Sequence, residues 1–333
     1  MALLALTLLT ALGQAAAART PWQARLTLLQ RVSWSDDEAP LRARGPPLPP
    51  FDRVGAARHN TAALPAEVVA SPRPEDYLAD SAIPAGWDWR SIQVAVGAPS
   101  VHFTTRIRNQ FLPLWCGSCW AHAATAVLGS RWLISNADQP APTNATFAGI
   151  DFSVQYFIDC VNGSRGCHGG SAYEAFHLAH EFGTVDSSCI PYSAYNKNCT
   201  AHNTCEQNLD GRHPKILSVD PIRYFVGEFG VVGAKMASVE EKESAMMKEI
   251  FARGPIASCM ACPEEFEEYT GGIFATTNNR TVCDHIVAII GFGGEGTSAH
   301  WVVQNSFGSV WGEVSQRFQW SMTPSPPPKI RSV

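Results

Sequence analysis

The first 115 residues of this 333-residue chain contain no cysteine, although the whole chain has ten. All ten lie between Cys116 and Cys283, so the N-terminal part and the remainder differ in kind. Disulfide bonds form in oxidising compartments, and a cysteine-rich region of this sort is typical of a secreted protein. The chain also lacks an excess of one charge: the net charge is −5 and both signs are scattered, which predicts no nucleic-acid surface.

No apolar run reaches the roughly 20 residues that a bilayer requires, so we predict no membrane span. Residues 1–18 are interpreted as a signal peptide, because the apolar stretch Ala2–Leu12 is followed by alanines at positions 15–18. The alternative is a buried helix, but the stretch has no polar face. No Lys or Arg precedes the stretch, where signal peptides usually carry a positive charge.

Four tripeptides fit the acceptor pattern for N-glycosylation. One match is frequent by chance, whereas four together support passage through the secretory pathway. The predicted glycosylation sites are Asn144, Asn162, Asn198 and Asn279.

Composition divides the rest of the chain into three regions. Residues 19–81 are rich in Pro, Arg and Ala and lack periodicity, which indicates a propeptide or a disordered linker; composition does not separate the two. Residues 82–313 have the character of a packed domain. The whole chain is 45% hydrophobic, which suffices for a large core at this length. Residues 314–333 form a divergent, Pro-rich tail.

Helical patterns come first along the domain, and strand patterns follow. Apolar residues at helical spacing predict helices over 119–133, from 153 onward, over 171–182 and over 239–252. Short runs rich in β-branched and aromatic residues predict strands over 286–292 and 301–304. This order predicts an α+β fold with two lobes.

Cys116 and Cys119 form a Cys-x-x-Cys pair that has two interpretations. A thioredoxin-like redox pair requires a buried strand before the motif, but residues 104–110 are polar and weakly patterned. Alternatively, Cys119 lies in the first turn of the helix 119–133, where the helix dipole stabilises a thiolate. The second interpretation makes Cys119 a candidate nucleophile.

A thiolate nucleophile requires a histidine and a group that orients the imidazole. His285 precedes one predicted strand and Asn305 follows the next. Each lies ten residues from Glu295 in the intervening turn, so a hairpin centred there makes them cross-strand neighbours, roughly 5 Å apart at Cβ. The alternative is a structural histidine and a turn asparagine. His177 and His180 lie three residues apart, but no further ligand cluster accompanies them, so we predict no metal and no cofactor.

These motifs resemble the signatures of papain-like cysteine peptidases, and they occur in the same order. The matching segments are Gln110, Cys116-Gly-Ser-Cys119-Trp120-Ala-His, Gly166-Cys167-His-Gly169-Gly170, Asp284-His285 and Asn305-Ser-Phe-Gly-Ser-Val-Trp311-Gly312. The likeness runs from about Ser71 to Glu313. It implies a two-lobed fold, a helical lobe and a β-barrel-like lobe, with the active site in the cleft between them.

The resemblance also implies the roles of individual residues. Cys119 is expected as nucleophile, His285 as general base and acid, and Asn305 as the group that orients the imidazole. Gln110 is expected in the oxyanion hole, with the Cys119 backbone N–H as the second donor. Gly169 and Gly170 are expected to line the cleft where the substrate backbone passes. The implied disulfides are Cys116–Cys167, Cys160–Cys199 and Cys189–Cys205.

The implied partners are peptide or protein substrates, and the implied location is the lysosome or the outside of the cell. The sequence leaves the oligomeric state open, with a monomer favoured. Within the family, the chain is similar to a carboxypeptidase branch with a lengthened loop after Gln110. In that branch a histidine directly after the glutamine holds the substrate's C-terminal carboxylate. Here the position is Phe111, which has no hydrogen-bond donor, so Arg106 or Arg108 would have to compensate. An endopeptidase of the same fold is therefore the alternative.

Two further departures concern the second lobe. Phe307 stands where the family usually has a tryptophan that shields the Asn–His contact. After Glu313 the tail lacks the family's Gly-Trp strand, which predicts an exposed sheet edge and leaves Cys259, Cys262 and Cys283 without obvious partners. A catalytically inactive homologue or splice form that acts by binding is therefore a second alternative.

Overall fold

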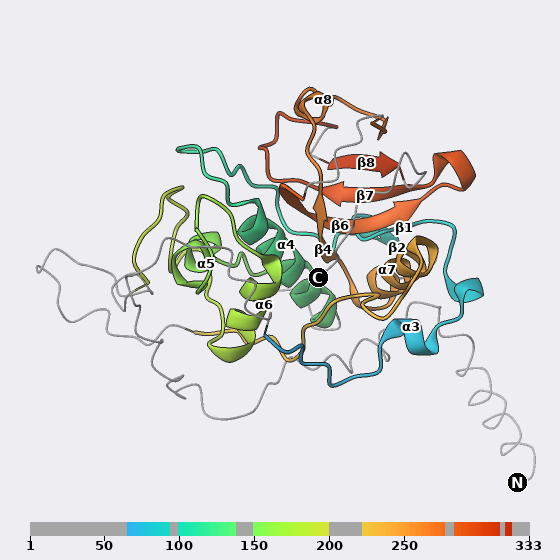
Figure 1. Ribbon diagram of the computed structural model, residues 1–333, viewed down its shortest axis with the longest axis horizontal. Coiled ribbons are helices and arrows are strands. Elements are labelled where there is room, and N and C mark those ends of the chain that lie inside the picture. Colours follow the sequence, from blue (N-terminus) through green and yellow to red (C-terminus); the bar gives the residue numbers. More distant parts are fainter. Residues whose placement is uncertain are drawn as a thin grey trace, which may run out of the picture.

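The computed structural model places a group of helices beside a twisted sheet (Figure 1). It describes residues 65–93, 99–137, 149–199, 222–276 and 283–313 with their side chains, and residues 317–321 as backbone. The predicted signal peptide, most of the predicted propeptide and the end of the tail lie outside these residues. Among the described helices, none is long and apolar enough to cross a membrane.

The helical lobe is built around α4, Cys119–Ser135, which packs against α5, Val154–Cys160, and α6, Ala172–Glu181. All three helices confirm the sequence-based prediction. Arg131 interrupts the apolar face of α4 without ending the helix, because its guanidinium pairs with Glu249 at 2.9 Å. The core of this lobe contains large side chains that are fully buried: Trp120, Phe152, Tyr156 and Phe157.

The second lobe is a six-stranded sheet in the order β1-β6-β7-β8-β5, with β4 also paired to β6. Its strands are β1 Trp87–Asp88, β4 Ile256–Met260, β5 Ile273–Phe274, β6 His285–Gly293, β7 His300–Gln304 and β8 Arg317–Ser321. Strands β6 and β7 confirm the two predicted strands. The described strands do not close into a barrel, because β1 and β5 at the ends of the order have two residues each and do not pair. The barrel-like lobe expected from the resemblance is thus an open sheet.

Helix α7, Val239–Arg253, packs against β4 and β6. It begins with a capping box, in which the Ser238 Oγ accepts from the Glu241 N–H and the Glu241 carboxylate accepts from the Ser238 N–H. Gly254 ends it with a φ of 122°, a conformation that favours glycine. The remaining described elements are short: α3 Pro74–Tyr77, α8 Glu264–Glu267, the 3₁₀ turns Asp80–Ala82 and Gly296–Ser298, and the strand pair β2 Ile92–Gln93 and β3 Ser100–Val101.

The beginning of the tail forms β8, which pairs antiparallel with β7 and parallel with β5. The exposed edge predicted from the missing Gly-Trp strand is therefore wrong. Strand pairing depends on backbone N–H and C=O groups, so a different sequence can supply the strand. The second lobe thus keeps a strand beyond β7 despite its unusual sequence.

Three disulfides join described cysteines. The structure links Cys116 to Cys167 and Cys160 to Cys199, with Cα–Cα distances of 4.5 and 4.9 Å, as the resemblance implies. Cys189 is also disulfide-bonded, whereas its expected partner, Cys205, lies outside the described residues. The third link joins Cys259 to Cys283, which the sequence left without obvious partners, at a Cα–Cα distance of 5.6 Å.

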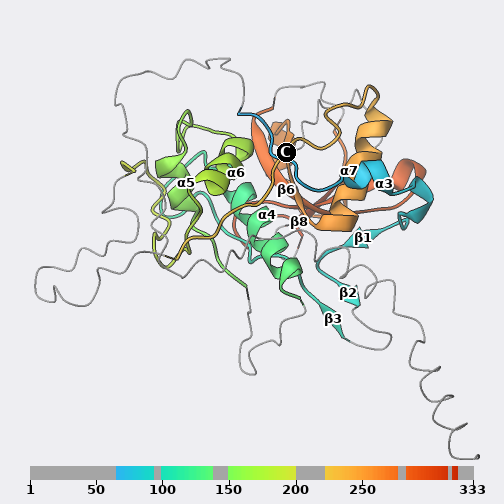
Figure 2. The same cartoon turned by 90° about the horizontal axis from the view of Figure 1, so that it is seen from below.

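Residues 65–82, here called the N-terminal strap, run from the helical lobe to α7 (Figure 1). At the start of the strap, the Tyr173 hydroxyl of α6 donates to the Pro65 carbonyl at 2.7 Å. Near its end, Asp80 pairs with Lys248 of α7 at 2.7 Å. Figure 2 shows α3 of the strap beside α7. The strap therefore bridges the two lobes, although it belongs to the predicted propeptide.

Candidate active site

Cys119 is the first residue of α4 and is partly exposed. Burial raises the pKa of its thiol, and the charge of Asp284 adds to this, whereas the backbone N–H groups of Ile286, Trp120 and Cys119 itself lower it. The net direction is upward. It is opposite to the stabilised thiolate predicted from the helix dipole, because lost hydration outweighs the N–H groups at the helix start.

The Ile286 N–H that acts on the Cys119 thiol belongs to the residue directly after His285, so α4 and β6 bring these two predicted residues together. Cys119 is not linked to Cys116, which is bonded to Cys167 instead. The pairing argues against a redox-active Cys-x-x-Cys. The thiol of Cys119 is left to act as a nucleophile.

His285 and Asn305 are in contact: His285 Nε2 lies 2.8 Å from Asn305 Oδ1. They are not the direct cross-strand pair that a hairpin centred on Glu295 predicts. In the register next to the site, Ala288 faces Gln304, and a bulge between Ile289 and Gly291 shifts the pairing. Asn305, one residue beyond Gln304, therefore reaches His285 diagonally across the sheet.

Both members of this pair are buried, with exposed fractions of 4% each. Burial lowers the pKa of His285, although the hydrogen bond to Asn305 and the charge of Asp284 act to raise it. The amide oxygen of Asn305 also accepts from the Ser306 N–H at 2.8 Å, which holds that oxygen in place. The lowered pKa thus favours the neutral imidazole, and the ring is fixed by Asn305.

Gln110 is buried beside Cys116, and its orientation is fixed from both ends. The Ser306 hydroxyl donates to Gln110 Oε1 at 2.6 Å, so the amide nitrogen points the other way. That nitrogen donates to the Cys116 carbonyl at 3.1 Å and has a second hydrogen available. The arrangement fits the oxyanion donor implied by the resemblance.

Gly169 and Gly170, which are expected to line the cleft, have different structural reasons for being glycine. Gly169 has a φ of +113°, and a Cβ there would meet nothing closer than Arg165 at 3.9 Å, so its surroundings are open. At Gly170 a Cβ would come within 2.4 Å of the Trp120 ring. Gly170 is therefore required for packing in the helical lobe, which the sequence did not indicate.

Phe111 lies against Phe307, with ring centroids 5.1 Å apart, and Phe307 in turn lies 4.9 Å from His285. Arg106 and Arg108, the candidates to replace the missing histidine, both pair their guanidiniums with Asp151. Their role as a carboxylate anchor stays a prediction.

Tyr192, which lies behind Cys119, was not identified from the sequence. The Ser118 hydroxyl does not cap α4; it lies 2.9 Å from the Tyr192 hydroxyl, which donates to the Gln110 carbonyl at 2.7 Å. His122 is buried under this group, and burial together with the charge of Arg108 lowers its pKa to about 3. These contacts join distant segments, and no local pattern marks them.

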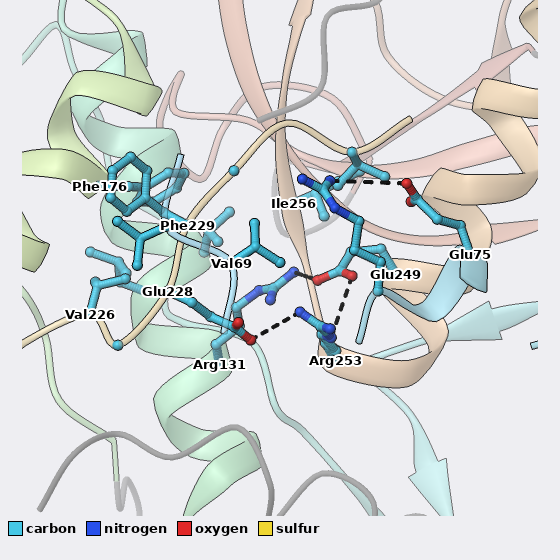
Figure 3. A pocket seen from close by; sticks show the side chains of 17 residues that line it. Val69, Glu75, Arg131, Phe176, Val226, Glu228, Phe229, Glu249, Arg253 and Ile256 are labelled. Atoms are coloured by element: carbon cyan, nitrogen blue, oxygen red, sulfur yellow. Dashed lines mark hydrogen bonds and ion pairs between the residues drawn. The ribbon is translucent and has the colours of Figure 1, made fainter. Parts of the chain in front are cut away.

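A concave site that Cys119 does not line lies between the strap, α4 and α7 (Figure 3). It encloses about 120 Å³, and no predicted catalytic residue lines it. Arg131 pairs with Glu249, and Arg253 with Glu228 at 3.1 Å, so these charges neutralise one another. Among the described residues, no cysteine or histidine lines the pocket, so it lacks the residue types predicted to act as nucleophile and base at Cys119.

The profile of the papain family of cysteine proteases matches residues 83–318, which include all the residues placed around Cys119. This chain belongs to that family.

Among individual relatives, the chain is 33% identical to cathepsin Z of Onchocerca volvulus over 241 residues, which is 72% of this chain and 70% of that protein. It is 28% identical to human cathepsin O over 69% of this chain and 59% of that protein. In fold it is similar to the bromelain protease of Ananas comosus, with a TM-score of 0.54, 24% identity, and coverage of 75% of this chain and 97% of that one.

Proposed function

We propose that this cysteine peptidase cleaves peptide bonds with Cys119 as nucleophile, His285 as general base and acid, and Asn305 as the residue that orients the imidazole. The observation that supports this most directly is the 2.8 Å contact between the buried side chains of His285 and Asn305. Cys119 begins a helix of one lobe and His285 begins a strand of the other, β6. The backbone N–H of Ile286, the next residue of β6, acts on the Cys119 thiol, which supports nucleophilic catalysis.

The directions of the two pKa shifts favour a neutral thiol and a neutral imidazole before substrate binds. In the proposed reaction, His285 takes the thiol proton as Sγ attacks the carbonyl carbon of the substrate. The resulting oxyanion accepts from the Cys119 N–H and from the second hydrogen of Gln110 Nε2. His285 then gives its proton to the leaving amine, which yields a thioester. Water, deprotonated by His285, hydrolyses the thioester and restores the thiol.

C-terminal trimming is the finer form of this proposal. The similarity to cathepsin Z and the lengthened segment between Gln110 and Cys116 support it. Phe111 favours the second candidate, internal cleavage, because it cannot hold a carboxylate. Amidation of the substrate's C-terminus distinguishes the two: trimming activity falls sharply, whereas internal cleavage is unaffected.

The compartment and the processing of the chain complete the proposal. We place the protein in the lysosome or outside the cell, with residues 1–18 removed as a signal peptide and a propeptide preceding the domain. The exposed side chains of Asn162 and Asn198 are accessible for glycosylation. Asn144 and Asn279 lie outside the described residues.

Peptide hydrolysis by the purified protein tests the mechanism. Cys119→Ala is expected to abolish turnover while the thermal unfolding transition stays cooperative and unshifted within about 2 °C. Asn162→Gln, an exposed change far from the nucleophile in sequence, serves as control and keeps full activity. Equal turnover by the wild type and Cys119→Ala would exclude the mechanism. A folded wild type without turnover would favour the inactive homologue.

A further inference from the structure

A small cavity lies where α4 meets β6 and the end of β7, next to Asn305. It encloses about 10 Å³, close to the space that one water molecule requires. Neither Cys119 nor His285 is among the described residues that line it. The cavity is therefore separate from the proposed nucleophile and base, although it adjoins the residue proposed to orient the imidazole.

Three buried residues that line this cavity each carry one polar atom with no hydrogen-bond partner among the described residues. These atoms are His122 Nε2 on α4, Gln304 Oε1 at the end of β7 and Asn305 Nδ2. A buried polar atom without a partner costs free energy, so such atoms are rare in folded proteins. Three of them around one cavity of this size call for a common explanation.

The remaining contacts of His122 determine what its Nε2 atom can do. His122 Nδ1 lies 3.0 Å from the Ser118 carbonyl, which can only accept, so Nδ1 carries the hydrogen. The ring is neutral, because burial and the charge of Arg108 lower its pKa to about 3. Nε2 of His122 is therefore an acceptor.

The amides of Gln304 and Asn305 are oriented in the same way by their other bonds. Gln304 Nε2 donates to the Thr105 hydroxyl at 3.2 Å, which leaves Oε1 as an acceptor. Asn305 Oδ1 accepts from the Ser306 N–H and lies 2.8 Å from His285 Nε2, which leaves Nδ2 as a donor. The cavity is thus lined by one unpaired donor group and two unpaired acceptors.

We propose that one buried water accepts from Asn305 Nδ2 and donates to His122 Nε2 and Gln304 Oε1, and that His122 acts through it as a positioning residue for Asn305. A water with three hydrogen bonds is the usual form of buried water in proteins. It would hold the Asn305 amide on its nitrogen side, while Ser306 and His285 hold its oxygen. The inference rests on the proposed function, because it states how the oxygen of Asn305 stays turned toward His285.

A crystal structure of the wild type at a resolution that shows ordered water tests the site directly. A water is expected within about 3.2 Å of each of the three atoms. In His122→Phe, which keeps a ring but has no acceptor, that water is expected to be lost and the Asn305 amide to be less ordered. The wild-type structure keeps the test decisive if His122→Phe does not fold.

Steady-state kinetics tests the positioning role. His122→Phe is expected to lower kcat on the order of 10-fold, because Asn305 and the imidazole are then less well aligned. KM should change little, since His122 does not line the cleft residues that bind substrate. In an Asn305→Ala background the same substitution should lower kcat no further, because a positioning residue acts only through its target. His122→Gln, which can present an amide oxygen as acceptor, should recover most of the activity.

His180→Phe is the matched control. His180 Nδ1 also lies beside a backbone carbonyl, that of Val226 at 2.6 Å, but His180 does not line the cavity, so the variant is expected to keep the wild-type kcat. Absence of the water, or an equal loss of kcat from His122→Phe with and without Asn305, would overturn the inference while the proposed function stands. A folded wild type that cleaves no peptide would overturn the proposed function, and the crystal structures would then decide the inference by themselves.

Discussion

Gln110 shows how one side chain is fixed for a single task. Ser306 holds its oxygen and the Cys116 carbonyl takes one amide hydrogen, which leaves the other for a developing oxyanion. We expect Gln110→Ala to lower kcat by ~10²–10³-fold with little change in KM, because the hydrogen bond matters mainly in the transition state. Ser306→Ala should lower kcat less, since the amide is then loosened but still present. Steady-state kinetics on one peptide substrate checks both; a KM effect alone would contradict the role.

The His285 imidazole determines the expected behaviour in acid. Burial lowers its pKa below the usual 6.5, so the neutral base persists to lower pH, and the acid limb of kcat/KM should have its midpoint below 6.5. The bond to Asn305 raises that pKa, so Asn305→Ala should move the limb further toward acid as well as reduce kcat. A pH–rate profile measures both, and a limb that moves toward neutral pH in the variant would contradict the assignment.

At the residue scale, the sequence was sufficient to predict that His285 and Asn305 lie together, because each lies in a short motif with a recognisable neighbour. The catalytic roles of Cys119, His285 and Asn305 stay predictions. The sequence was not sufficient for Ser306, Tyr192 or Asp151, whose contacts cross between distant segments. It also led to the wrong expectation for the pKa of Cys119, since burial is a property of the folded surroundings and not of the helix position.

At the element scale, the helices were predicted well, because amphipathic spacing and caps such as Ser153 and Ser238 are local signals. Register was predicted poorly. The bulge between Ile289 and Gly291 displaces the pairing of β6 and β7, and no turn signal marks it. Strand β8 was missed because its sequence departs from the family's, whereas its pairing uses backbone groups only.

Helix α5 carries a buried carboxylate that makes the stability of the fold depend on pH. Asp159 Oδ1 accepts from Gln155 and from the Lys197 N–H, but burial raises its pKa to about 6. Because the folded pKa lies above the usual 3.8, its contribution to stability is complete below pH 3.8 and is lost as the pH rises through 6.

Asp159→Asn removes the free-energy cost of ionising this buried carboxylate. We expect the variant to exceed the wild type at pH 7 by up to about 3 kcal/mol, the equivalent of the pKa shift from 3.8 to about 6, and to gain little at pH 4. Urea unfolding at the two pH values gives the difference. The exposed Asp76→Asn is the control and should leave the free energy of unfolding unchanged at both pH values. An equal gain at both pH values in Asp159→Asn would show that the effect is not titration of Asp159.

At the scale of the whole molecule, the strap is held by the carboxylate of Glu228. This residue lies in the segment that connects the helical lobe to α7. Glu228 accepts from the N–H groups of Ala70 and Ser71 at 2.8 and 2.9 Å and pairs with Arg253. Burial alone would raise the pKa of Glu228, but the bonds from Ser71 and Ala70 and the charge of Arg253 outweigh it and hold the pKa below its usual 4.5. These contacts are therefore complete above pH 4.5 and weaken as the carboxylate is protonated below it.

Glu228→Gln keeps the shape of the side chain and removes its charge. We expect amide hydrogen exchange at residues 68–73 to accelerate ~10–100-fold at neutral pH, the equivalent of about 1.5–3 kcal/mol for charge-assisted hydrogen bonds. The exposed Glu240→Gln on α7 is the matched control. Unchanged exchange in Glu228→Gln would mean that the strap is held by its other contacts.

The contacts of the strap determine whether it stays bound to the domain after the chain is processed. It packs against α6, the segment around Glu228 and α7, where it lines the concave site between the strap, α4 and α7 (Figure 3). A cut between residues 81 and 82, the end of the predicted propeptide, would therefore sever the backbone without freeing the piece. We expect the processed protein to be a two-polypeptide particle, with one mass in native mass spectrometry and two after denaturation.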